Sequence, residues 1–151
     1  MNVKKLKKNK KGFTLVEIIV VLVIIGILMA LAVPAISKYI NQAAETKVSS
    51  QVRAGYTAAQ TYVTNYIGDH PGATNEALEA LVKGDNGIKN VNEELGIDTT
   101  AGSDGTISGP EGAVKKISCT LTNKKIDSCE ITVVGSDISY IATPTKIEPK
   151  K

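Results

Sequence analysis

Residues Gly12–Val33 read GFTLVEIIVVLVIIGILMALAV, an apolar stretch that contains a single acid, Glu17. The 21 residues from Phe13 to Val33 would form a helix roughly 31 Å long at 1.5 Å per residue, enough to cross a bilayer core. A charged side chain at the centre of a membrane helix costs about 2.5–3.5 kcal/mol even on the insertion scale, which gives the lowest values. An acid is therefore not expected in a segment that serves only as a membrane anchor. Glu17 is therefore a candidate functional residue.

The basic residues at the start of the chain predict its orientation. Six lysines and no acid lie among the first twelve residues, at positions 4, 5, 7, 8, 10 and 11. This asymmetry predicts a cytoplasmic N-terminus and places the C-terminal part outside. Taking these six from 18 Lys and Arg leaves 12 against 15 Asp and Glu, so the remainder is acidic and offers no basic face for nucleic acid.

Processing is expected before the apolar segment rather than after it. A secretory signal has an apolar region of about 7–15 residues and a small-residue cleavage site, whereas this segment is longer and has no such exit. Gly12 has no side chain to obstruct a peptidase. Further along, Gly26 and Pro34 weaken the helix. Together they indicate a flexible link in the helix. Alternatively, Gly26 is a packing glycine and Pro34 marks the membrane exit.

Residues 35–67 continue the helix with an amphipathic pattern. Apolar or small residues recur every three or four positions: Ile36, Ile40, Ala44, Val48, Val52, Gly55, Ala59, Tyr62 and Tyr66. This face is expected to pack on the C-terminal half of the same chain. Gly68 and Pro71 predict the end of the helix.

The next segment, residues 68–112, is predicted to be a variable region of loops and short helices. Thr74 is expected to cap a helix that runs to Leu81 or Val82 and stops at Gly84. Residues 91–95 are expected to form another helical turn, and the glycines that follow to form a flexible connection.

Residues 113–142 are predicted to form an antiparallel sheet. The segments AVKKISCTLT and IDSCEITVV flank the polar turn NKK, and β-branched residues partly alternate along both. Cys119 and Cys129 are each five residues from Lys124, so they could face one another across a hairpin unless a bulge shifts the register. An exported chain favours a disulfide over two free thiols. Residues 143–151 are expected to be a loose tail.

The sequence contains no catalytic constellation and implies no cofactor. His70 lies in the turn sequence GDHPG with no nucleophile or metal set beside it. Asp98, Asp104 and Glu111 make a calcium ion conceivable, although their spacing matches no calcium loop. The chain is therefore predicted not to be an enzyme and to hold no metal.

The run KKGFTLVE at Lys10–Glu17 resembles the start of a type IV prepilin with a class III leader. In that family a prepilin peptidase removes the leader after the glycine and methylates the new N-terminal residue. The resemblance implies that residues 1–12 are removed, that cleavage follows Gly12 and that Phe13 is methylated. It is strong to about Ile36 and only architectural beyond that point.

Other positions extend this resemblance. Glu17 matches the acid of the family motif, while Gly26 and Pro34 match its helix glycine and proline. Many pilins also close a C-terminal segment with a disulfide, which Cys119 and Cys129 resemble with a shorter spacing.

The resemblance implies an α+β subunit with a C-terminal antiparallel sheet packed on the amphipathic half of a long N-terminal helix. Residues 13–34 would be first a membrane anchor and then a filament core, where Glu17 pairs with the Phe13 ammonium of a neighbouring subunit. The implied partners are further copies of the chain, the prepilin peptidase, an inner-membrane platform protein and a cytoplasmic ATPase, with minor pilins as further candidates.

The implied location is the cytoplasmic membrane before assembly and an extracellular pilus afterwards, which would serve adhesion, motility, biofilm formation or DNA uptake. One alternative is a pseudopilin of a type II secretion or competence apparatus. Another is a signal-anchored protein that keeps its leader and forms no polymer.

Overall fold

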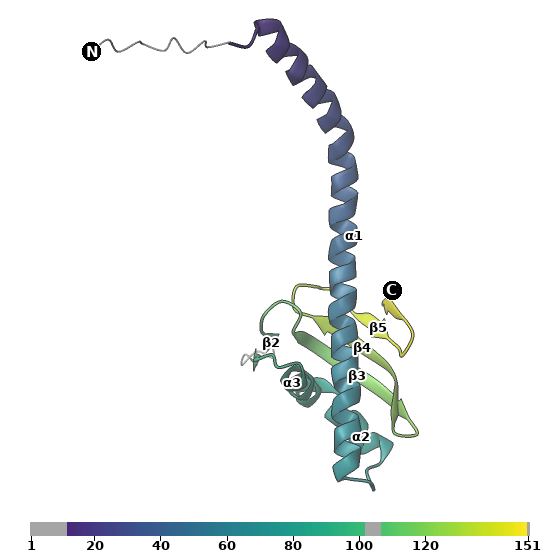
Figure 1. Cartoon of the computed structure of the whole chain (residues 1–151). Helices are drawn as coiled ribbons and strands as arrows, with labels where there is room; N and C mark the ends of the chain where they lie inside the picture. Colours follow the sequence, from purple (N-terminus) through teal and green to yellow (C-terminus); the bar gives the residue numbers. More distant parts are fainter. Residues whose placement is uncertain (1–11, 102–106, 151) are drawn as a thin grey trace, which may run out of the picture. The chain divides into compact units, whose positions relative to one another are not determined.

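The structure is a computed structural model that describes residues 12–101 and 107–150. These residues form three helices and six strands (Figure 1). The helices are α1 (Leu15–Asp69), α2 (Asn75–Leu81) and α3 (Gly84–Glu94). The strands are β1 (Thr100–Ala101), β2 (Ile107–Ser108), β3 (Val114–Thr122), β4 (Lys125–Val133), β5 (Tyr140–Ala142) and β6 (Ile147–Pro149).

The chain divides into two compact units between Gln42 and Ala43, and α1 contributes to both. In the second unit the C-terminal part of α1 is combined with α2, α3 and two antiparallel sheets. Strands β3, β4, β5 and β6 lie side by side in that order, and β1 pairs with β2. The predicted α+β class, a long N-terminal helix followed by an antiparallel sheet, is confirmed.

The core of the second unit lies between α1 and the inner face of the four-stranded sheet. Val52, Tyr56, Ala59 and Val63 recur at helical spacing on one face of α1 and are at most 2% exposed. They belong to one cluster with the inward residues of β3 and β4, namely Val114, Ile117, Cys119, Leu121, Ile126, Cys129, Ile131 and Val133. Burial of this apolar surface is the main source of stability for the unit.

The predicted packing face of α1 is only partly right. Ile36, Ile40 and Ala44 are exposed, and Val48 is partly buried. Burial of this helix face therefore begins near Val48. Gly55 allows the helix and β3 to lie close together, because a Cβ atom there would lie 3.1 Å from Cγ2 of Val114.

The end of α1 also differs slightly from the prediction. The helix continues through Gly68 to Asp69, and the His70 amide still bonds the Tyr66 carbonyl at 2.9 Å. Pro71 has no amide hydrogen with which to extend this pattern, so it is the better stop signal.

The region predicted to be mostly loops contains more regular structure than expected. Thr74 caps α2 by accepting a hydrogen bond from the Ala77 amide, which confirms the predicted helix. Helix α3, however, begins at Gly84 and spans 11 residues rather than a single turn around Val91. Its glycines disfavour a helix locally, but Ile88 and Val91 are buried in the core and stabilise it.

The β3–β4 hairpin closes with a two-residue turn. Asn123 and Lys124 have φ angles of 51° and 61°, as a type I′ hairpin turn requires at both central positions. Thr122 consequently faces Lys125. The Lys124 amide donates a 2.9 Å hydrogen bond to Oδ1 of Asn75 in α2, which holds the turn in place.

A bulge after the turn brings the two cysteines opposite each other. Continuing the turn register without interruption would place Cys119 opposite Ser128. The register instead shifts between Thr120 and Leu121, with one extra residue on β4, so that Cys119 faces Cys129. The two-residue turn and the one-residue bulge together place Cys119 opposite Cys129, as counting five residues to either side of Lys124 predicted.

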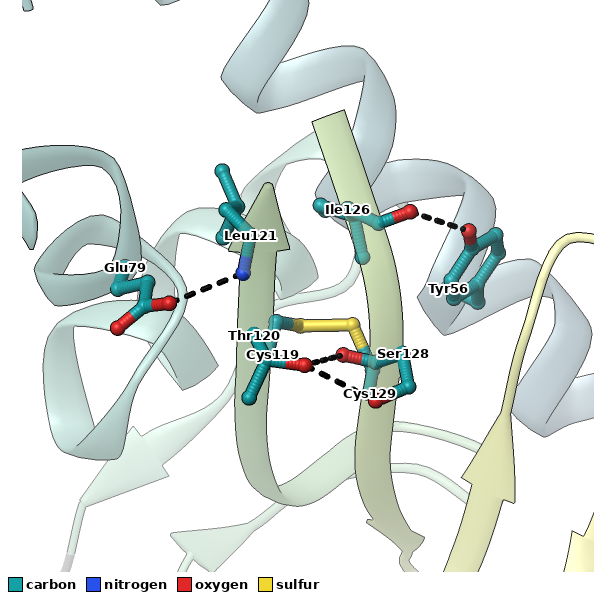
Figure 2. The surroundings of a disulfide bond; sticks show 8 residues. All are labelled: Tyr56, Glu79, Cys119, Thr120, Leu121, Ile126, Ser128 and Cys129. Atoms are coloured by element: carbon teal, nitrogen blue, oxygen red, sulfur yellow. Dashed lines mark hydrogen bonds between the residues drawn. A yellow bond between two sulfur atoms is a disulfide. The ribbon is translucent and has the colours of Figure 1, made fainter. Parts of the chain in front are cut away.

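The cysteines form the predicted disulfide, which lies on the core side of the hairpin (Figure 2). Cys119 is 3% exposed and Cys129 is fully buried. Near the turn, the Tyr56 hydroxyl donates a 3.1 Å hydrogen bond to the Ile126 carbonyl. Burial raises the pKa of Tyr56, an effect that Arg53 opposes and Asp127 reinforces, so this hydroxyl remains a donor at neutral pH.

Residues 143–150 are not the loose tail that their prolines and lysines predict. They form the turn after β5 and then β6, which pairs antiparallel with β5. Pro149 is tolerated because β6 is at the edge of the sheet, where a missing amide hydrogen costs no ladder bond. The Arg53 guanidinium donates hydrogen bonds to the carbonyls of Thr143 and Pro144 at 2.8 and 3.3 Å, which attaches the turn to α1.

An ion pair also fixes the end of β6 to β4. Nζ of Lys150 lies 2.6 Å from Oε2 of Glu130, and Lys116 approaches the same carboxylate at 3.7 Å. The hydrogen bond from Lys150 is the main cause of the lowered pKa of Glu130. This pair therefore contributes to stability above the unfolded-state pKa of Glu130, and the contribution is lost as pH falls through the lowered value.

Removing the disulfide should destabilise the second unit. For the double variant Cys119→Ala and Cys129→Ala in the full chain in detergent micelles, we expect the free energy of unfolding to fall by about 2–4 kcal/mol, mainly because the unfolded chain regains freedom. Denaturant titration followed by circular dichroism measures the change, and the reduced wild-type chain is the matched control. Equal midpoints for oxidised wild type and double variant would contradict this role.

Candidate functional site

The N-terminus of α1 is capped by Thr14. Its side-chain oxygen accepts a hydrogen bond from the Glu17 amide at 3.3 Å, and its carbonyl accepts one from the Ile18 amide at 3.3 Å. Glu17 thus occupies the third position of the helix, where its carboxylate complements the positive end of the helix dipole. The helix begins at Leu15 because the Thr14 side chain satisfies the Glu17 amide, which has no partner within the helix.

This capping role of Thr14 is the functional detail that the sequence analysis missed. The signal was present, because Thr14-Leu-Val-Glu17 has the spacing of a capping box, a threonine followed three residues later by a glutamate. The amide of Glu17 makes the local bond, while its exposed carboxylate remains available for a second role.

Gly12 and Phe13 lie immediately before the helix and are both exposed. Apart from its chain neighbours, no described residue places an atom within 4 Å of the position that a Cβ would take at Gly12. Phe13 is 78% exposed. Residues 1–11, which contain the six lysines of the predicted leader, lie outside the described residues. The bond between Gly12 and Phe13 is therefore flanked by accessible residues and precedes the first helical turn.

The apolar surface of α1 is continuous and has no cover within its own unit. Every large apolar side chain from Phe13 to Ile40 is exposed. Within the part of the chain that the structure describes, α1 is the one helix long and apolar enough to cross a membrane. A patch of this size on a soluble monomer is unusual and indicates a surface that contacts lipid or protein.

Gly26 and Pro34 lie inside the continuous helix α1. Gly26 is exposed, and a Cβ there would meet no atom within 4 Å, so it is not held by packing within the unit. Pro34 removes one backbone hydrogen bond. Ser37 donates its hydroxyl to the Val33 carbonyl at 3.1 Å on the next turn. Whether these residues form a flexible link stays a prediction.

The remaining candidate residues of the sequence are not brought together. Glu111 forms an ion pair with Lys47 at 2.8 Å, and Asp104 lies outside the described residues. The His70 ring stacks on Tyr66, with ring centroids 4.2 Å apart. In residues 12–101 and 107–150, no group of three or more His, Cys, Asp or Glu side chains is placed to hold a metal ion.

Comparison with known proteins agrees with this geometry. Residues 7–33 match the prokaryotic N-terminal methylation motif. The chain is 51% identical over 49 residues to the type IV major alpha-pilin of Moraxella bovis, which is 32% of this chain and 31% of that protein. It is 34% identical over 62 residues to the type IV major pilin of Myxococcus xanthus, covering 41% and 28% of the two chains.

A secretion-system protein matches over a longer segment. The type II secretion system core protein G of Pseudomonas aeruginosa is 40% identical over 77 residues, which is 51% of this chain and 53% of that protein. The chain thus spans between 28% and 53% of the length of these relatives. No solved structure matches it.

The motif, the fold and these relatives confirm the predicted resemblance to type IV pilins. The N-terminal region of this chain is similar to the N-terminal regions of type IV pilins. The relatives named above are two pilins and a core protein of a secretion system.

Substitution of Thr14 by alanine should loosen the first turn of α1. Loss of an N-cap costs about 0.5–2 kcal/mol, so amide exchange at Glu17 and Ile18 should accelerate by roughly fivefold. Hydrogen exchange measured by NMR on the chain in micelles tests this. Thr14→Ser keeps the hydroxyl and should exchange like wild type, and equal acceleration in both variants would argue against the cap.

Proposed function

We propose that this chain is the structural subunit of a type IV pilus. The observation that carries the proposal is the uncovered apolar surface of α1, which begins at a methylation motif and contains the single acid Glu17. Such a surface is stable in a bilayer as a single helix and stable outside it only when packed against other copies. Subunits would therefore wait in the cytoplasmic membrane and then polymerise with their sheet-bearing units outward.

Cleavage between Gly12 and Phe13 would create a charged partner for Glu17. A new ammonium on Phe13 can neutralise the Glu17 carboxylate of a neighbouring subunit inside an apolar filament core, where an unpaired charge is costly. Prepilin peptidase, a platform protein and an assembly ATPase would supply cleavage and energy. The methyl group would reside on the Phe13 amine.

A pseudopilin of a secretion or DNA-uptake machine is the second candidate. It is favoured by the match to core protein G, which extends over 51% of this chain, whereas the match to the Moraxella pilin extends over 32%. Both candidates require the same N-terminal processing, but a pilus subunit forms long surface filaments. Electron microscopy of sheared cell-surface material, with identification of the filament subunit, separates them.

The N-terminus of the surface protein tests the processing step. Mass spectrometry of the native protein should find a peptide that begins with N-methylated Phe13. An intact leader, residues 1–12, on the surface protein would overturn the proposal and support a signal-anchored protein instead.

Loss of the Glu17 charge should impair assembly without impairing membrane insertion. Glu17→Ala leaves the amide that Thr14 caps but leaves the neighbouring Phe13 ammonium without its partner. Breaking a buried pair in this way is costly, so the yield of filaments should fall by about tenfold or more. Immunoblotting of sheared and membrane fractions measures both quantities.

Two controls isolate the charge from the cap. Glu17→Gln keeps the size of the side chain and should assemble as poorly as Glu17→Ala. Thr14→Ala weakens the cap and keeps the carboxylate, so it should assemble far better than either. Normal filament yield from both Glu17 variants would remove the charge-pairing argument.

A further inference from the structure

The four-stranded sheet has two outer strands, β3 and β6, which differ in length. β3 has nine residues and β6 has three. The outer side of an edge strand presents unpaired backbone amides and carbonyls, and a long apolar edge is a template for pairing with another copy. The residues that occupy the outer side of β3 therefore determine how this sheet can associate.

At the start of β3 a single side chain takes the place of a neighbouring strand. Asn92 of α3 is 1% exposed. Its Nδ2 donates to the Val114 carbonyl at 2.9 Å, and its Oδ1 accepts from the Val114 amide at 2.8 Å. The amide group thus satisfies both backbone groups of Val114, as an antiparallel strand would.

Two further contacts occupy the middle and the end of the same edge. Lys83, which precedes α3, forms an antiparallel bridge with Ser118. The Leu121 amide donates to Oε1 of Glu79 in α2 at 2.9 Å, and Figure 2 shows this carboxylate pointing at the edge of β3. Asn92, Lys83 and Glu79, here called the edge clamp, all belong to the segment 75–94.

The β6 edge has a different kind of protection. Its three residues include Pro149, which has no amide hydrogen, and Lys146 and Lys150 flank it. Short length, proline and lysine each discourage strand addition.

We propose that the edge clamp prevents the sheet of one subunit from pairing with the sheet of a second copy. Open polymerisation through sheets needs two complementary edges on every subunit. With β3 clamped and β6 short, the sheet offers neither, so association is left to the apolar surface of α1. The segment between α1 and the sheet then has a second purpose besides packing, namely to keep crowded subunits from associating through their strands.

Opening the clamp in the full chain, with its disulfide intact in detergent micelles, tests this proposal. Asn92→Leu removes both bonds to Val114, so amide exchange there should accelerate by about tenfold or more. The variant should also form concentration-dependent, thioflavin-positive oligomers, which wild type should not.

Asn90→Leu is the matched control for this variant. Asn90 lies on the same helix and donates a bond of the same 2.9 Å length, but to the Leu81 carbonyl rather than to the sheet. The control should remain thioflavin-negative. If it associates as strongly as Asn92→Leu, general destabilisation of α3 explains the result and the proposal is overturned.

A second pair of variants tests the other end of the edge. Glu79→Leu removes the acceptor for the Leu121 amide and should also promote association, whereas Glu79→Gln keeps an acceptor oxygen and should behave like wild type. Asn92→Leu could unfold the core, and loss of hydrogen-exchange protection at the Ile131 amide would show this. In that case the two Glu79 variants test the proposal.

Faster exchange at Leu121 in Glu79→Leu, with wild-type size and no thioflavin signal, would show that an open edge is harmless and would overturn the proposal. The assay involves no pili. A negative result therefore leaves the proposed function unaffected, and a failure of filament assembly in the Glu17 variants leaves this proposal unaffected.

Discussion

The burial of apolar surface is the constraint on which the rest of this protein depends, and α1 meets it in two ways. From Phe13 to Ile40 its large apolar side chains are exposed, and leaving this much apolar surface in water is unfavourable. From Val52 onward the same helix buries its apolar face against its own sheet. One continuous helix thus carries both a long exposed apolar surface and part of the core of a folded unit.

The hairpin of β3 and β4 shows how much of that core depends on register. A slip of one residue turns every inward side chain outward. The turn at Asn123 and Lys124, the bulge after it and the disulfide all specify the same pairing. Tyr56 adds a hydrogen bond from α1 to β4, so the helix and the hairpin stabilise one another.

The two kinds of contact surface in the molecule have opposite properties. The N-terminal part of α1 is large, apolar and uncovered, and its helical backbone has internal partners for its polar groups. The sheet, by contrast, has free backbone groups only at its edges, and segment 75–94 occupies the longer edge. Non-directional apolar contact is therefore the mode of association that this fold leaves open, and directional strand pairing is the mode that it suppresses.

The order of lysines, glycine, acid and apolar run predicted α1, its orientation and the pilin resemblance, because these are local properties of consecutive residues. Alternation along the hairpin likewise predicted the sheet, and the equal spacing of Cys119 and Cys129 about Lys124 predicted that they could face one another. Tertiary contacts decided the rest. Helix α3 forms despite its glycines because the core holds Ile88 and Val91, and β6 forms because β5 offers it an edge. The role of Asn92 exists only because Val114, 22 positions away, lies beside it, and local patterns carry no information about such a distant partner.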